Sequence, residues 1–116
     1  MKLQSKKYLL DIARACRLIT EFTARKSQAD YGTDVYLRSA VERQFQIAGE
    51  ALVRLLNTDP GSAARITDYR SIIDFRNIVV HGYDALRAET VWDIIQVNVP
   101  VLLREAESLL AEPDDP

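Results

Sequence analysis

The 116-residue sequence has little glycine, proline, cysteine or histidine, and each scarcity restricts the folds or the chemistry that the protein can have. Four glycines and four prolines are too few for a many-stranded sheet, which needs a turn signal about every 8 to 12 residues. The single cysteine, Cys16, cannot form an internal disulfide, and with the single histidine, His81, it makes no recognisable metal cluster. The sequence therefore predicts no metal or cofactor, and its cysteine usage suits a reducing cytoplasm.

Long apolar runs are also missing. No run approaches the roughly 18 residues of a membrane span, and the apolar stretch before Asp11 is too short for a signal peptide. We therefore expect a soluble cytoplasmic protein with no membrane partner. A chain of 116 residues can build one hydrophobic core but not two. We expect one domain over residues 1–111 and an acidic flexible tail over residues 112–116.

The chain has no large excess of either charge, since its net charge is −2. This argues against a protein that coats nucleic acid non-specifically. The average hides a gradient, because residues 1–30 hold seven Lys and Arg against three Asp and Glu, whereas residues 84–116 hold two against eight. Solvated helix faces are the ordinary explanation of such a gradient, but the N-terminal part could also bind phosphate.

Helical periodicity dominates what is present. Apolar residues recur at three- and four-residue steps, and the expected long helices span residues 5–24, 34–57, 68–83 and 89–110, with a short turn at 62–66. Thr33 or Asp34 should cap the second helix, and Pro100 should kink or restart the last. Gly49 costs about 1 kcal/mol within a helix, which indicates a close helix contact or an approaching ligand. The predicted fold is an all-α antiparallel bundle of about four to five helices.

The helix over residues 68–83 has two apolar surfaces. One broad face is formed by Ile72, Phe75, Ile78 and Val79. Ile73 and Val80 lie apart from that face, and a helix that is apolar on more than one side should be nearly buried. We expect the bundle to cover one surface and a second copy of the chain to cover the other, in a two-fold dimer.

The stretch "RNIVVHGY" places Arg76, Asn77 and His81 in the wedge between these surfaces. An arginine can stabilise charge on a phosphate, and an imidazole with a pKa of about 6.5 exchanges protons near neutral pH. RNA carries its own nucleophile, because its 2′-hydroxyl can attack the adjacent phosphorus without a metal. A two-fold dimer would present two histidines and two arginines at one composite site. A lone histidine near a helix C-terminus is, however, more often structural, and Tyr83 is ordinarily a packing residue.

Three segments of the chain resemble HepT-like toxins of the HEPN superfamily. The motif "RNIVVHGY" has an arginine followed by a polar residue, a histidine five positions after the arginine and a tyrosine two further on. The segment "RSAVERQFQIAGEAL" resembles the second helix of that family with its GEA core, and "VWDIIQVNVPVL" resembles the final helix with its proline. These segments cover most of the chain from Arg38 to Leu103, in the same order and at compatible spacing.

The resemblance implies a helical dimer with a metal-independent endoribonuclease site, belonging to a toxin–antitoxin pair. Arg76 would bind the scissile phosphate, His81 would transfer protons, and Asn77 would orient the substrate or the histidine. The implied partner is a minimal nucleotidyltransferase antitoxin that transfers AMP from ATP to the motif tyrosine, here Tyr83. An AMP group there would block RNA by bulk and negative charge.

Two further sets of residues are candidates for the same site. Possible RNA contacts are Lys6, Lys7, Arg14 and Arg17. Glu50, in the GEA segment, is a possible neighbour of the site, although it could equally be a surface ion-pair residue. The alternative function, from a different class, is a catalytically silent HEPN-like domain that only binds a nucleotidyltransferase or a nucleotide.

Overall fold

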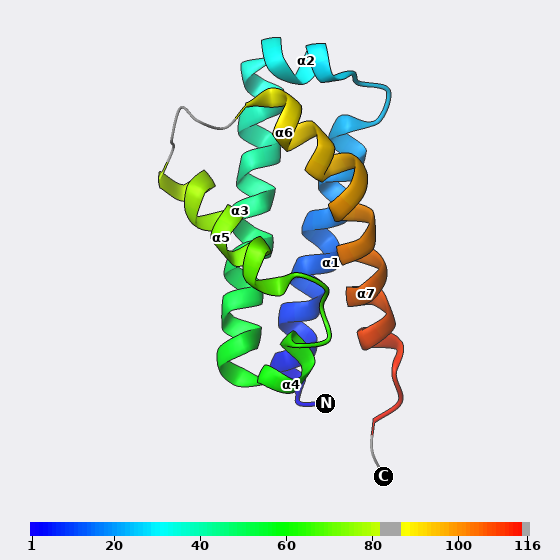
Figure 1. Ribbon diagram of the computed structural model, residues 1–116. Coiled ribbons are helices and arrows are strands. Elements are labelled where there is room, and N and C mark those ends of the chain that lie inside the picture. Colours follow the sequence, from blue (N-terminus) through cyan, green and yellow to red (C-terminus); the bar gives the residue numbers. More distant parts are fainter. Residues whose placement is uncertain (82–86, 115–116) are drawn as a thin grey trace.

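The computed structural model describes residues 1–81 and 87–114, with the backbone alone at residues 80 and 81. Within these residues all regular structure is helical (Figure 1). The elements are α1 (Leu3–Thr23), α2 (Gln28–Thr33), α3 (Val35–Thr58), α4 (Pro60–Ala63), α5 (Tyr69–His81), α6 (Ala88–Asp93), the π-helical turn η1 (Ile94–Asn98) and α7 (Val99–Ala111). The predicted all-α class is confirmed, whereas the two-fold dimer stays a prediction.

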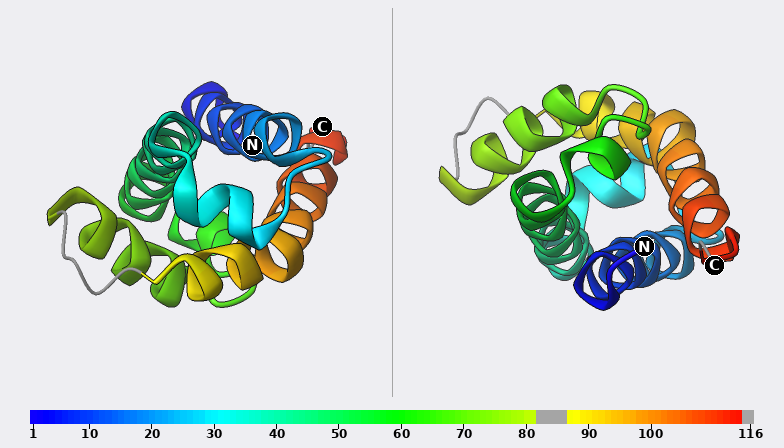
Figure 2. Two further views of the ribbon diagram at one scale, coloured as in Figure 1. Left: turned by 90° about the horizontal axis from the view of Figure 1, so that it is seen from above. Right: turned by 90° about the horizontal axis from the view of Figure 1, so that it is seen from below.

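The long elements form an antiparallel bundle. The chain runs up α1, down α3, up α5 and down the continuous segment from α6 through η1 to α7 (Figure 1). Viewed along the bundle, these elements surround a common core (Figure 2). The largest fully buried side chains include Leu9, Ile12, Ile19, Tyr31, Val41, Leu52, Leu55 and Ile66. The periodic apolar stripes of α1 and α3 therefore meet in the core, as the sequence predicts.

Two caps define the start of α3 and a helix that the sequence does not reveal. The Asp34 carboxylate accepts hydrogen bonds from the amides of Tyr36 and Leu37, which confirms it as the cap of α3. Ser27 and Asp30 form a capping box that starts α2 within a stretch predicted to be irregular. The expected end of the first apolar stripe was also wrong, because α1 stops at Thr23 and Ala24 is exposed.

The last helix restarts at Pro100, as expected, and the restart changes which residues face the core. Proline lacks the amide proton that an α-helix needs, and the π-helical turn η1 directly precedes α7. Its i→i+5 bonds add a residue to the turn and rotate the next part of the helix about its axis. Val97 of η1 is 64% exposed, whereas Val99 at the start of α7 is buried at 3%.

Helix α5 packs chiefly on α3, and a single copy of the chain leaves part of its apolar surface exposed. Among its described side chains only Val79 is buried, and Ile78 is 39% exposed. Ile73, predicted to lie apart from the core-facing side, packs half-buried against the core of its own chain, because the apolar arc continues to it from its neighbour Ile72. The near burial expected of α5 depends on cover by a second copy of the chain and stays a prediction.

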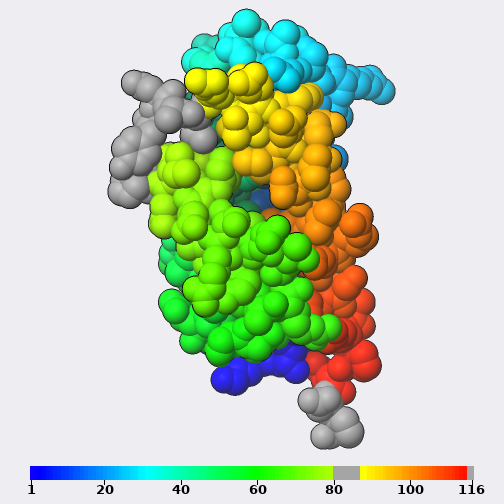
Figure 3. Space-filling view, viewed as in Figure 1, coloured from blue at the N-terminus to red at the C-terminus, as the bar shows by residue number. Residues whose placement is uncertain are grey.

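An apolar cavity of about 350 Å³ opens between α5 and the α6–α7 segment. Its walls include Ile72 and Phe75 of α5 and Val101 of α7, and its floor includes Cys16 of α1. Figure 3 shows this hollow near the centre of the visible face. Phe45 of α3 supports this wall through an edge-to-face contact with Phe75, and the two ring centroids lie 5.0 Å apart. Helix α5 is thus held from one side, by α3.

No helix in the described parts of the chain combines the length and the hydropathy of a membrane-spanning segment. The acidic C-terminal residues form ion pairs as far as the structure describes them: Glu112 with Arg65, and Asp114 with Lys6. Each partner stabilises the carboxylate form, which lowers the pKa of both acidic groups. Flexibility of residues 112–116 stays a prediction.

Candidate active site

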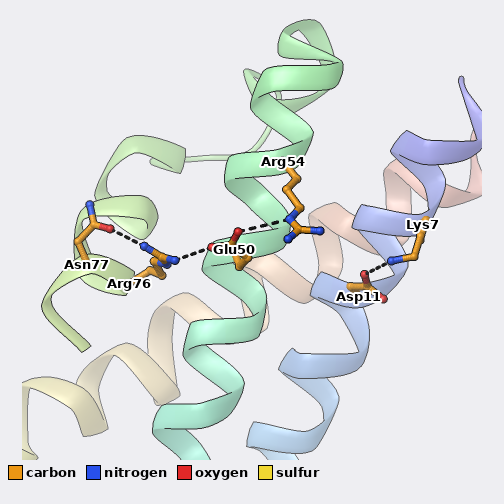
Figure 4. A network of polar contacts seen from close by, with 6 residues as sticks. All are labelled: Lys7, Asp11, Glu50, Arg54, Arg76 and Asn77. Atoms are coloured by element: carbon orange, nitrogen blue, oxygen red, sulfur yellow. Dashed lines mark hydrogen bonds and ion pairs between the residues drawn. The ribbon is translucent and has the colours of Figure 1, made fainter. Parts of the chain in front are cut away.

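Arg76 lies on α5 with its guanidinium directed at α3. Its Nη2 donates to Glu50 Oε2 at 2.5 Å, and its Nη1 donates to Asn77 Oδ1 at 2.9 Å. On the other side of Glu50, the Arg54 Nε donates to Oε1 at 3.3 Å. One carboxylate therefore bridges two guanidinium groups, and Figure 4 shows the chain of contacts from Asn77 to Arg54. Glu50 therefore contacts Arg76 directly, whereas a role for it in an active site stays a prediction.

Gly49 explains why Arg76 can approach α3 so closely. A Cβ at this position would collide with Cβ and Cγ of Arg76. The sequence predicts either a close helix contact or a ligand at Gly49, and the structure shows a helix contact made by the aliphatic stem of Arg76. The glycine and the glutamate that comes directly after it thus act on the same side chain, one on its stem and the other on its charge.

Burial of one guanidinium nitrogen of Arg76 carries an energetic cost. Its Nε is buried, and within the described part of the chain no acceptor lies within hydrogen-bonding distance. A buried donor without a partner costs about 1–3 kcal/mol, so other contacts of Arg76 have to outweigh this cost. Buried groups of this kind call for an explanation, and a functional site is one of those expected.

His81 is the last residue of α5, one helical turn beyond Asn77. Its side chain and all of Tyr83 lie outside the described residues. The structure therefore brings together Arg76, Asn77 and Glu50. The pairing of Arg76 with His81 and the acceptor role of Tyr83 stay predictions.

A cavity of about 400 Å³ adjoins Arg76 on the outer surface of α3, between α5 and α1. Its charged lining residues are Lys7, Asp11, Arg43, Glu50, Arg54 and Arg76. Lys7 is ion-paired with Asp11 at 3.2 Å (Figure 4). Of the four basic residues predicted as RNA contacts, Lys7 is the one that lines this cavity.

The other three predicted RNA contacts lie elsewhere on the bundle. Lys6 is paired with Asp114 at 2.8 Å, and Arg17 is paired with Glu107 of α7 at 3.0 Å. Arg14 is exposed on α1 and does not line the cavity. Within the described part of the chain, none of these three side chains lines the cavity beside Arg76.

Arg43 and Arg54 are cavity residues that the sequence pattern did not assign to the site. They lie eleven positions apart on α3, three turns along one face, with Glu50 between them. This spacing was the only sequence feature that could have indicated Arg43 and Arg54, and it shows only that they share one face of a helix. Nothing local in the sequence shows that Arg76, on another helix, lies beside that face.

Among the described residues, no three Asp, Glu, His or Cys side chains gather as metal ligands would. The fold and the site together define a helical-bundle protein in which Arg76, anchored to Glu50 and Asn77, lies beside a cationic cavity. The family model described as "Ribonuclease HepT-like" matches residues 12–109. The chain belongs to this HepT-like family.

Curated relatives agree with this assignment. "Probable ribonuclease HepT" of Thermococcus cleftensis is 31% identical over 94% of this chain and 98% of its own length. "Putative RNase MJ1380" of Methanocaldococcus jannaschii is 28% identical over 88% of this chain and 93% of its own. A longer protein of that organism, "Gamma-glutamylcyclotransferase and putative RNase MJ0434", is 26% identical over 98% of this chain, which spans about half (51%) of it. No solved structure matches the chain significantly.

Proposed function

We propose that the protein is a metal-independent endoribonuclease toxin of a cytoplasmic toxin–antitoxin system, with its active site at the interface of a two-fold dimer. One observation carries the proposal. In a chain of the HepT-like ribonuclease family, Arg76 of the motif helix is anchored to Glu50 and Asn77 beside a cationic cavity. Membership of a family described by ribonuclease activity makes RNA the substrate to test first.

The proposed reaction is an internal transfer with release of the 5′-oxygen. A base removes the proton of the 2′-hydroxyl, the 2′-oxygen bonds to phosphorus, and the bond from phosphorus to the 5′-oxygen breaks. An acid protonates that leaving oxygen, which leaves a 2′,3′-cyclic phosphate and a 5′-hydroxyl. Arg76 stabilises the negative charge that develops on the phosphate. His81 serves in proton transfer, with the second copy supplied by the other subunit, and Asn77 orients Arg76 through its side-chain oxygen.

The first experiment incubates total cellular RNA with purified, unmodified protein in EDTA, side by side with His81→Ala. We expect cleavage by the wild type only, because the variant lacks the group that exchanges protons near neutral pH. Circular dichroism and light scattering establish that both proteins are folded and in the same oligomeric state. Equal cleavage by the variant would refute the role of His81.

The antitoxin is proposed to be a nucleotidyltransferase that modifies Tyr83. The tyrosine oxygen attacks the α-phosphorus of ATP, forms Tyr–O–AMP and releases pyrophosphate. Incubation with the partner and ATP should raise the intact mass in steps of one AMP and abolish RNA cleavage. If Tyr83→Phe gains the same mass, the acceptor is another residue.

The second candidate function is a catalytically silent HEPN-like domain that binds a nucleotidyltransferase or a nucleotide. One observation favours it: the Arg76 guanidinium is already bound by the Glu50 carboxylate, which a substrate phosphate would have to displace or share. The RNA-cleavage experiment separates the two functions. No cleavage by either protein, with both folded and dimeric, would favour the silent domain.

A further inference from the structure

We propose that the cavity beside Arg76 is a second phosphate-binding subsite, which holds the RNA strand next to the scissile phosphate. Arg54 and Arg43 would bind the neighbouring phosphate, and Tyr8 would offer a surface for a base. This proposal rests on the proposed ribonuclease function, because the subsite is defined relative to the phosphate at Arg76. It adds residues of α1 and α3 to a site that the motif restricts to α5.

The charge of the cavity favours an anion. Its lining holds four basic side chains and two carboxylates, an excess of two positive charges, in a chain whose net charge is −2. The single Glu50 carboxylate is shared by two guanidinium groups, and Arg43 is hydrogen-bonded to the neutral amide of Gln46 at 3.4 Å. The cationic charge here is therefore only partly compensated by the protein's own carboxylates.

Arg54 has hydrogen-bond donors available for a ligand. Its Nε is engaged by Glu50, and within the described part of the chain its two terminal nitrogens have no acceptor in hydrogen-bonding range. The side chain is 59% exposed, so these nitrogens are open to a ligand. Guanidinium groups bind phosphate oxygens through paired donors, which makes Arg54 suited to hold a phosphodiester.

The remaining surface of the cavity suits a nucleobase. Tyr8 is half-buried in its lining beside Ile47 and Ala51, and the Lys7 ammonium lies 5.7 Å from the centre of the Tyr8 ring. Proteins bind single-stranded RNA by combining cationic grooves with aromatic rings on which bases stack. The volume of about 400 Å³ is within the range of about 300–1,000 Å³ for small-ligand pockets.

The position of the cavity ties it to the proposed cleavage site. Arg76 and Arg54 contact the two oxygens of the same carboxylate, so their guanidinium groups lie on either side of Glu50 (Figure 4). A strand that brings its scissile phosphate to Arg76 can continue across α3 and reach Arg54 with the next phosphate. The cavity therefore extends the site toward α1.

The test measures binding of a labelled single-stranded RNA to His81→Ala, which is not expected to cleave it, at several salt concentrations. Adding Arg43→Gln and Arg54→Gln should weaken binding about tenfold. It should also reduce the slope of log affinity against log salt by about 0.7, because each phosphate contact in a single strand contributes about 0.7 and the two arginines are proposed to hold one phosphate. Arg43→Lys with Arg54→Lys keeps the charge and should retain most of the slope. Arg104→Gln, exposed on α7 outside the cavity, should change neither quantity.

Stacking is tested separately at Tyr8. In the same background Tyr8→Leu should lose about tenfold in affinity, whereas Tyr8→Phe should retain it, because stacking needs the ring and not the hydroxyl. Equal affinities for the two variants would overturn the stacking role.

Other outcomes distinguish failure of the subsite from failure of the proposed function. Unchanged affinity and slope in the double glutamine variant, with His81-dependent cleavage intact, would refute the subsite alone. Absence of both RNA binding and cleavage in the wild type would refute both proposals. If adenosine monophosphate binds as tightly as the RNA, and loses binding equally in the double variant, the cavity is a nucleotide site and the RNA-strand assignment is wrong.

Discussion

Two neighbours on α3 determine where Arg76 lies. Gly49 leaves room for its stem, and Glu50 binds its guanidinium. Arg76 is 26 positions from Glu50 in the sequence and one more from Gly49, so both contacts depend on how α5 packs on α3 and not on local helix spacing. Substitutions at Gly49 and Glu50 therefore test geometry and charge separately.

Gly49→Ala should displace Arg76. The added methyl group would overlap the stem of Arg76, and such overpacking costs about 1–3 kcal/mol. We expect a lower free energy of unfolding in urea and weaker RNA cleavage. Gly61→Ala is the matched control, because its Cβ would meet its nearest neighbour, Asp59 Oδ1, at an ordinary 3.8 Å. If Gly49→Ala matches the control in both measurements, α5 moves away without cost and the close contact has no role.

Glu50→Gln should separate positioning from binding. The amide keeps the shape but removes the negative charge that holds Arg76 and Arg54. We expect kcat for RNA cleavage to fall several-fold because Arg76 is less firmly placed, and KM to fall because the cavity becomes more cationic. Glu107→Gln, which removes a carboxylate paired with Arg17 outside the cavity, should change neither value. A rise in kcat would mean that Glu50 restrains Arg76 instead of positioning it.

At the scale of the elements, periodicity predicts the long helices but not how their residues are phased or joined. The bounds of α1 and α3 differ from those expected by at most two residues, because apolar stripes at helical spacing are a strong local signal. The π-helical turn η1 adds a residue that a fixed period of 3.6 cannot represent, and Val97 is exposed there while Val99 is buried.

The sequence singled out Arg76 and Asn77 on the motif helix and Glu50 on α3, but not Arg43 and Arg54. Arg76 and Asn77 are adjacent in the motif, and their hydrogen bond agrees with that spacing. The part of the site contributed by Arg43 and Arg54 arises from packing between helices. A solvated helix face and the rim of a cavity have the same sequence pattern, so composition could not distinguish them.

The corner between α3 and α5 contains a cap whose contribution depends on pH. The Asp59 carboxylate accepts hydrogen bonds from the amide and hydroxyl of Ser62 at the start of α4. The hydroxyl bond is the main cause that holds the pKa of Asp59 below its ordinary value of 3.8. A carboxyl group whose pKa is lower in the folded state stabilises the protein above its unfolded pKa, and this stabilisation is lost as the pH falls through the folded pKa.

Asp59→Ala should therefore lower the free energy of unfolding by about 1 kcal/mol at pH 7, as loss of a helix cap does. The difference from wild type should begin to narrow as the pH falls below 3.8, the ordinary pKa that Asp59 has in the unfolded chain, because the unfolded state then takes up the proton before the folded state does. Urea denaturation at pH 7 and near pH 3 measures both values. A difference that stays constant across this range would show that the carboxylate charge does not contribute.

At the scale of the whole molecule, the motif helix has one packed side and one open side. Ile78 is partly exposed, and α5 packs chiefly on α3. The proposed dimer would cover the open side with the motif helix of a second copy, since a two-fold interface pairs identical surfaces. This arrangement would supply the second histidine that the proposed reaction needs.

Val80→Glu tests the dimer. Val80 belongs to the second apolar surface predicted for the motif helix, and a charge buried there without a partner would disrupt association. We expect monomers by light scattering and loss of RNA cleavage. Val97→Glu, at an exposed position of η1, should leave the oligomeric state unchanged. A Val80→Glu protein that remains dimeric would refute this placement of the interface.

The contact between Gly49 and Arg76 also links ligand binding to the docking of a helix. The stem of Arg76 forms part of the surface by which α5 packs on α3, so ligand binding and the docking of α5 both depend on this side chain. Thermodynamic linkage is reciprocal: if a phosphate binds Arg76 better when α5 is docked, then the phosphate strengthens the docking by the same factor. Amide hydrogens of α5 should accordingly exchange more slowly when RNA is bound. Because residue 49 has no side-chain methyl group, Arg76 can contact both the substrate and α3, and substrate binding is thereby coupled to the stability of the motif helix.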